Sequence, residues 1–175
     1  MRLDKMKRKG QVWVETVIYI LIGLSLIALV LAFVTPRINE QRDRIVVEQA
    51  LLSLNVLDGK INEVINMGRN NKRIIDFSIR KGALHINSEK DEIVFVLDGL
   101  TKPYSEPGLD IPIGRVIVRT IEGKKTSSVN LTLEYAPENN LISGGEEKNT
   151  KLNPAPLPYR LSIENKGQID IIQIS

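Results

Sequence analysis

Few residues in this chain lie in a pattern that would indicate catalysis. There is one histidine, His85, within an apolar–polar alternation typical of a strand, and there is no cysteine. The acidic pairs Asp91-Glu92 and Glu146-Glu147 lie in polar, turn-like segments that are typical of solvated loops. Gly144-Gly145 matches no phosphate-cradling pattern, and neither a calcium loop nor a zinc-binding HExxH motif occurs. We therefore expect no enzyme, no cofactor and no metal site, and interpret His85 as a structural residue.

One motif predicts a covalent modification. Asn130-Leu131-Thr132 is the one N-glycosylation sequon in the sequence. In a strand, Leu131 would share a face with its apolar neighbours at positions 129 and 133, which leaves Asn130 and Thr132 on the opposite face. An outward-facing Asn130 on an exterior domain is therefore a candidate N-glycosylation site. The intact mass of the native protein tests this prediction.

Glu15 is the only charged residue in a long apolar run, Val12 to Val34. These 23 residues match the roughly 20 that a membrane-spanning helix needs. Five basic residues precede the run, at positions 2, 5, 7, 8 and 9, and no small-residue cleavage site closes it, unlike a secretory signal peptide. We therefore expect a single retained span, with the N-terminus cytoplasmic and everything after Pro36 outside.

The position of Glu15 has two physical interpretations. A carboxylate within an apolar span costs a few kcal/mol to insert, so such a residue usually has a partner or a task. An interfacial carboxylate near the start of a helix, where the helix dipole favours an anion, accounts for Glu15 equally well. Both interpretations remain open on these grounds.

The same residues carry a family resemblance. A basic leader ending in Gly, followed by Gln as in Lys9-Gly10-Gln11, with Glu15 five residues past that glycine and an apolar run to Val34, resembles the class III signal of archaeal type IV pilin-like proteins. The resemblance covers about the first 35 residues. It implies that a prepilin peptidase cleaves between Gly10 and Gln11. It also implies that Glu15 meets the free amino terminus of a neighbouring subunit and sets the register of assembly.

The partners that the resemblance implies are other copies of the chain, the prepilin peptidase and, indirectly, a pilus assembly platform and ATPase. The membrane would hold the subunit before assembly, and the filament would display it at the cell surface afterwards. Composition argues against nucleic acid as a further partner. The pI near 9.1 comes from residues 1–10, whose five basic and one acidic side chains leave 19 basic and 20 acidic residues in the rest of the chain.

After the apolar run the periodicity is that of an amphipathic helix. Apolar residues recur at three- and four-residue spacing, at Val47, Leu51, Leu54, Leu57 or Asp58, Ile61, Val64 and Ile65. Gly68, followed by two asparagines, is a plausible stop. Pro36 and Gly59 leave it open whether one helix continues through both.

From Arg73 the periodicity changes to two and turn signals recur. About seven strands are expected, near 75–79, 83–86, 93–97, 115–121, 127–135, 159–163 and 169–174. The strand at 93–97 is apolar throughout and is expected to be covered on both faces. The segment 101–114, with three prolines, should be an irregular loop, and 136–158 should be mobile or loosely wrapped.

The sequence thus predicts an α+β chain: a long N-terminal helix, apolar and then amphipathic, followed by a small, mostly antiparallel β-domain. The expected divisions are a leader at 1–10, an apolar helix at 11–36, an amphipathic helix at 37–68 and an extracellular β-domain at 73–175. The leading hypothesis is a structural pilin. The alternatives are a minor pilin or pseudopilin of a secretion or uptake machine, and an uncleaved single-span anchor that displays a binding domain. An adhesive role is open, because no residue pattern names a ligand.

Overall fold

The computed structural model describes residues 3–174, with side chains described for residues 13–174. The chain forms two compact units, residues 1–41 and residues 42–175. One helix, α1 (Leu3–Asn66), provides all the described structure of the first unit and the first element of the second. It passes through both Pro36 and Gly59, which settles the continuity that the sequence left open.

The C-terminal part of α1 has the apolar stripe that its periodicity predicted. Val47, Leu54, Ile61 and Val64 are fully buried, and Leu57 is almost so. The helix ends where a glycine stop was predicted, because Gly68 adopts a positive φ of 83° and donates to the carbonyl of Ile65. The described structure is therefore α+β, as the sequence predicted: a long N-terminal helix followed by a mostly antiparallel β-domain.

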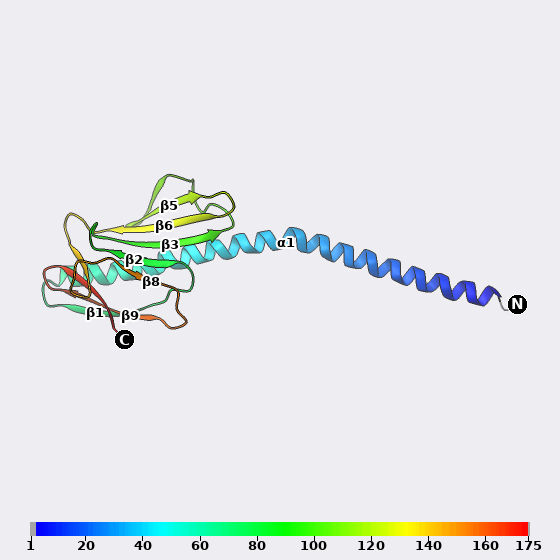
Figure 1. Ribbon diagram of the computed structural model, residues 1–175, viewed down its shortest axis with the longest axis horizontal. Coiled ribbons are helices and arrows are strands. Elements are labelled where there is room, and N and C mark those ends of the chain that lie inside the picture. Colours follow the sequence, from blue (N-terminus) through cyan, green and yellow to red (C-terminus); the bar gives the residue numbers. More distant parts are fainter. Residues whose placement is uncertain (1–2, 175) are drawn as a thin grey trace. The chain divides into compact units, whose positions relative to one another are not determined.

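Ten strands follow α1 in the part of the chain that the structure describes. They are β1 (Lys72–Phe77), β2 (Ala83–Asn87), β3 (Glu92–Leu100), β4 (Asp110–Ile113), β5 (Val116–Glu122), β6 (Ser127–Glu134), β7 (Leu141–Ser143), β8 (Thr150–Leu152), β9 (Tyr159–Asn165) and β10 (Ile169–Ile174). They form a four-stranded sheet, β1-β9-β10-β7, and a six-stranded sheet, β4-β5-β6-β3-β2-β8. Neighbouring strands are antiparallel except for the parallel pair β7 and β10. In Figure 1, β3, β5 and β6 of the larger sheet lie on one side of the C-terminal part of α1, and β1 and β9 of the smaller sheet lie on the other.

One hydrophobic core joins α1 to both sheets. It contains apolar side chains from the helix, from β1, β9 and β10 of the smaller sheet, and from β2, β3, β5 and β6 of the larger one. Gly82 allows two segments to approach closely beside this core. A Cβ on Gly82 would lie 2.3 Å from the carbonyl oxygen of Val96, and its φ of +84° also favours glycine.

Three strands lie where the sequence predicted none. β4 lies in the expected loop at 101–114, where Pro112 is tolerated because β4 is an edge strand. β7 and β8 lie within 136–158, so the expectation of a mobile or loosely wrapped segment is wrong for their residues. Each has only three residues, too few to show a period, and each is held by burial of apolar side chains such as Leu141 and Leu152.

One burial prediction is also wrong. β3 was expected to be covered on both faces, but Ile93, Phe95 and Leu97 are buried while Val94 and Val96 are half-buried. The reason is that the core covers one face of the larger sheet, so an apolar run here does not indicate two covered faces.

Candidate membrane-spanning and assembly segment

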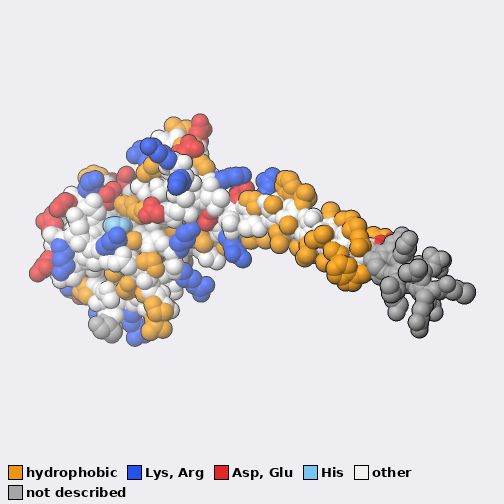
Figure 2. All heavy atoms as spheres, turned by 45° about the vertical axis from the view of Figure 1, so that its right-hand side comes forward, with side chains coloured by type: hydrophobic (Ala, Val, Ile, Leu, Met, Phe, Trp, Pro, Cys, Tyr) orange, Lys and Arg blue, Asp and Glu red, His pale blue; other side chains and the backbone are white. Residues whose placement is uncertain are grey.

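The first part of α1 presents its apolar side chains outward on all sides. Almost every residue from Trp13 to Val34 is exposed, Trp13 at 71%, and none of its most apolar stretch is buried. By length and composition this stretch can cross a membrane. Figure 2 shows hydrophobic side chains covering the part of the helix next to the residues that are not described. An apolar surface of this extent in water is unstable, so lipid or other protein must cover it.

Hydroxyl groups within this segment form hydrogen bonds inside the helix. Ser25 Oγ donates to the carbonyl oxygen of Leu21 at 2.7 Å, and Thr35 Oγ1 donates to that of Leu31 at 2.8 Å. Each hydroxyl therefore has a partner one turn earlier, which lowers the cost of placing it in hydrocarbon.

Glu15 differs from these hydroxyl residues. Its side chain is exposed, and the Tyr19 hydroxyl donates to its Oε1 across 3.4 Å, a long hydrogen bond for two oxygen atoms. A carboxylate has about four acceptor sites, so Glu15 can accept further and shorter hydrogen bonds from a donor outside this chain. The assembly role of Glu15 stays a prediction.

The predicted cleavage site lies at the edge of what the structure describes. The backbone of Gly10 and Gln11 belongs to α1, and their side chains lie outside the described residues. Cleavage between them stays a prediction.

Asn130 lies in β6, an interior strand of the larger sheet. Its register partners are Val96 in β3 and Arg119 in β5. The alternation expected for β6 is confirmed, because Val129 and Leu131 are buried while Asn130 is half-buried on the opposite face. Glycosylation of Asn130 stays a prediction.

His85 is half-buried in β2, opposite Val94 on one side and Lys151 on the other. Burial lowers the pKa of His85, and the positive charge of Lys151 lowers it further against a weaker opposing effect of Asp98. The imidazole therefore favours its neutral form. No other histidine exists to act with it, and its strand position is the one the sequence predicted.

A buried polar cluster joins α1 to the larger sheet. The hydroxyl of Tyr135 donates to Asp58 Oδ1 at 2.9 Å, and the Asn62 amide donates to Asp58 Oδ2 at 3.0 Å. The guanidinium of Arg115 lies 3.7 Å from Asp58 Oδ2 and 5.5 Å from the centre of the Tyr135 ring. Burial raises the pKa of Tyr135, and the charge of Asp58 raises it further, so the phenol remains a donor.

The sequence showed one part of this cluster. Asp58 stands on the apolar stripe of the helix, where a carboxylate is unexpected, and its 7% exposure confirms that position. Its partner Tyr135 is 77 residues away, so periodicity could not identify the pair. The cluster holds the fold of the second unit together, and no hollow opens onto it that would admit a substrate among those the structure describes.

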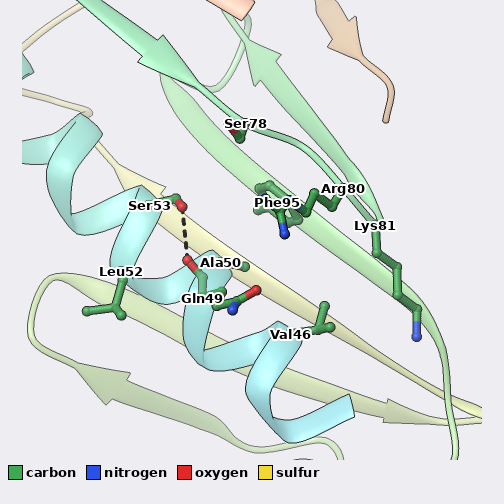
Figure 3. A pocket seen from close by; sticks show the side chains of 9 residues that line it. All are labelled: Val46, Gln49, Ala50, Leu52, Ser53, Ser78, Arg80, Lys81 and Phe95. Carbon is green, nitrogen blue, oxygen red and sulfur yellow. Dashed lines mark hydrogen bonds between the residues drawn. The ribbon is translucent and has the colours of Figure 1, made fainter. Parts of the chain in front are cut away.

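A groove of about 560 Å³ lies beside α1 in the second unit. Figure 3 shows Val46, Ala50 and Ser53 on the side of the helix toward Phe95, with Arg80 next to the Phe95 ring. Two of the helix residues that line the groove, Ala50 and Ser53, have small side chains. No acidic residue and no histidine lines it, so it offers no general acid or base.

No protein-family model matches the chain, and neither a curated protein nor a solved structure is significantly similar to it.

Proposed function

We propose that this chain is a structural subunit of an archaeal type IV pilus-like surface filament. A prepilin peptidase would remove residues 1–10, and the apolar part of α1 would pass from the membrane into a bundle of identical helices. The β-domain would then face the surroundings of the cell. No catalytic role is proposed.

The exposed apolar surface of residues 13–34 is the observation that carries this proposal. Every side of the helix is apolar there, which suits a lipid environment first and contact with several neighbouring helices afterwards. Gly23, Ser25, Ala28 and Ala32 are small and allow close approach of a second helix. A Cβ on Gly23 would meet no atom within 4 Å, so the surface beside this glycine is open to a neighbour.

Glu15 supplies the specificity in this scheme. In a water-poor helix bundle an unpaired carboxylate is strongly unfavourable, so only the axial register that brings a cation to Glu15 is stable. Cleavage after Gly10 creates such a cation, the free amino group of Gln11. The long contact with Tyr19 leaves Glu15 able to accept that amine.

The first experiment determines the amino terminus of the protein recovered from native membranes or from sheared surface material, by mass spectrometry. The proposal predicts a mature chain that begins at Gln11. A chain that still begins near Met1 would refute processing and favour an uncleaved single-span anchor.

A second experiment tests assembly directly. Glu15→Ala should lower filament yield while the β-domain keeps its thermal midpoint, because Glu15 lies in the first unit and is not part of the hydrophobic core of the second. Ser25→Ala is the matched control within the same apolar run, and it should assemble normally because its hydroxyl bonds only to its own helix. Normal filament yield from Glu15→Ala would refute the register role. The abundance of the chain in purified filaments then separates a major subunit from a minor pilin or pseudopilin.

A further inference from the structure

A polar hollow of about 350 Å³ lies in the second unit, where α1 ends. Three segments line it: residues 65–69 after the helix, residues 138–140 before β7, and residues 165–169 at the turn between β9 and β10. Its polar lining consists mostly of amide side chains with one arginine and one glutamate. The sequence did not predict this site, because the three segments are far apart in the chain.

Backbone hydrogen bonds hold the walls of the hollow in place. Asn165 joins two walls, since its backbone carbonyl accepts from Asn70 at 2.7 Å and its side chain donates to the Val64 carbonyl. The third wall is fixed to β10, because the amide of Ile169 donates to the carbonyl of Asn140 at 2.8 Å. These bonds fix the backbone of the walls, so the entropy cost of binding a ligand falls mainly on the side chains that line the hollow.

Gly167 allows the side chain of Arg69 to lie against the turn between β9 and β10. A Cβ at this position would lie 3.2 Å from the guanidinium of Arg69, so the absence of a side chain lets Arg69 lie over the turn. Its φ of +100° is also one that glycine adopts readily.

Five polar side chains around the hollow are open to solvent or a ligand, because four are exposed and Asn139 is half-buried. Among residues 13–174, whose side chains are described, none accepts from or donates to the side chains of Arg69, Glu138, Asn139, Asn140 and Gln168. The side-chain amide of Asn165, in contrast, already has partners within the protein: it donates to the carbonyl of Val64 and accepts from the backbone amide of Gly167. The hollow is therefore lined by polar side chains that are available to a ligand, and the backbone of its walls already forms hydrogen bonds within the protein.

The chemistry of these groups identifies a class of ligand. Each primary amide donates and accepts side by side, which matches a sugar hydroxyl because that group also does both. Arg69 adds donors and Glu138 adds acceptors, and their opposite charges leave the site with no net preference for an ion. An apolar ligand would leave these polar groups unpaired, which is unfavourable.

We propose that this hollow is a binding site for a neutral saccharide, held by Asn139, Asn140 and Gln168 with Arg69 and Glu138 at its sides. Binding exchanges water for protein partners at an open site, so the net gain per hydrogen bond is small and a dissociation constant on the order of 1 mM is expected. Saccharide binding at this site does not depend on whether the chain assembles into filaments.

Saturation-transfer difference NMR on the full chain tests the proposal. The detergent must be zwitterionic and free of sugar head groups, because a maltoside would compete. Glucose, galactose, mannose and N-acetylglucosamine are each offered at about 10 mM, and at least one should receive saturation. The double variant Asn139→Ala/Gln168→Ala should weaken that sugar about tenfold through its lost hydrogen bonds.

Asn153→Ala is the matched control, since it removes an exposed asparagine side chain outside the hollow, and it should bind as the unaltered chain does. Thermal unfolding checks that the double variant is folded. Absence of saturation for all four sugars overturns the proposal. Equal binding by the double variant, or displacement of the sugar by inorganic phosphate at similar concentration, also overturns it, the latter because it would indicate an anion site at Arg69.

Discussion

Removal of the Tyr135 hydroxyl is the best single test of how α1 is held to the β-domain. Tyr135 is 1% exposed, and its phenol donates to the carboxylate of Asp58 at 2.9 Å. The substitution Tyr135→Phe removes this donor and keeps the ring, so it creates almost no cavity. The stacked guanidinium of Arg115 keeps its aromatic partner as well.

The expected loss follows from the nature of the bond. A hydrogen bond to a charged group contributes about 1.5–3 kcal/mol, and Asp58 is too buried for water to replace the lost donor easily. Asp58 still accepts from Asn62 at 3.0 Å and lies 3.7 Å from Arg115, which limits the penalty. We therefore expect Tyr135→Phe to lower the free energy of unfolding by about 2 kcal/mol, equivalent to a fall of roughly 6 °C in Tm.

Urea unfolding of the full chain in detergent, followed by circular dichroism, measures this loss. The slope of the transition should be unchanged, because the same surface is exposed on unfolding. Tyr159→Phe is the matched control. The hydroxyl of Tyr159 donates to the Asn153 carbonyl at 2.8 Å at an exposed site, so its loss should be below about 1 kcal/mol.

Two results would contradict this account. If Tyr135→Phe and Tyr159→Phe lower the free energy of unfolding by the same amount, burial does not strengthen the hydrogen bond between Tyr135 and Asp58. If Asp58→Leu lowers the free energy of unfolding by less than Tyr135→Phe does, the buried carboxylate itself destabilises the fold, and an apolar residue at this position is the more stable choice.

Three further predictions concern ionisable groups. Asp43 accepts from the backbone and the hydroxyl of Thr101, each at 2.7 Å, so Asp43→Ala should cost about 2 kcal/mol of unfolding free energy in the same urea assay. Burial raises the pKa of Asp43, but these bonds, together with the hydrogen bond and positive charge of Lys81, lower the pKa below its ordinary value. The stabilisation should therefore be present at neutral pH and disappear as the pH falls through the lowered pKa. The lowered pKa of His85 means that protonation disfavours the folded state, so Tm should fall as the pH drops below 6.5, and His85→Gln should remove that part of the slope. Asp170 is fully buried and accepts hydrogen bonds from the Gly145 amide and from Lys166, each at 3.0 Å. Asp170→Ala should therefore lower the free energy of unfolding by about 2 kcal/mol. Lys166→Ala is the comparison and should have a smaller effect, because the side chain of Lys166 is half-exposed.

The helix was predictable because its signal is local and long. The stripe from Val47 to Val64 repeats over five turns, and each apolar position on it is buried in the structure. Strand β6 was equally predictable, because Val129 and Leu131 alternate with polar residues. In both cases the period of the sequence equals the period of the secondary structure.

Several of the missed features depend on partners far away in the chain. β7 is held by a parallel pairing with β10, in which Leu141 lies opposite Ile169, and three residues alone show no period. The Tyr135 bond to Asp58 and the polar hollow at the end of α1 likewise require that separate segments meet. A sequence pattern shows which side of a helix or strand is buried, but it does not show which other residues pack against that side.

Stability and assembly should therefore be separable in this chain. The core of the second unit includes α1 only from Val47 onward, whereas residues 13–34 bury none of their most apolar stretch. Leu54→Ala would leave a cavity at a fully buried position and cost about 2–5 kcal/mol, so it should reduce the amount of folded subunit and, through it, the amount of filament. Glu15→Ala should reduce filament at unchanged Tm and unchanged amounts of subunit in the membrane. If Glu15→Ala lowered Tm as Leu54→Ala does, Glu15 would be part of the fold of a single chain and not a contact between chains.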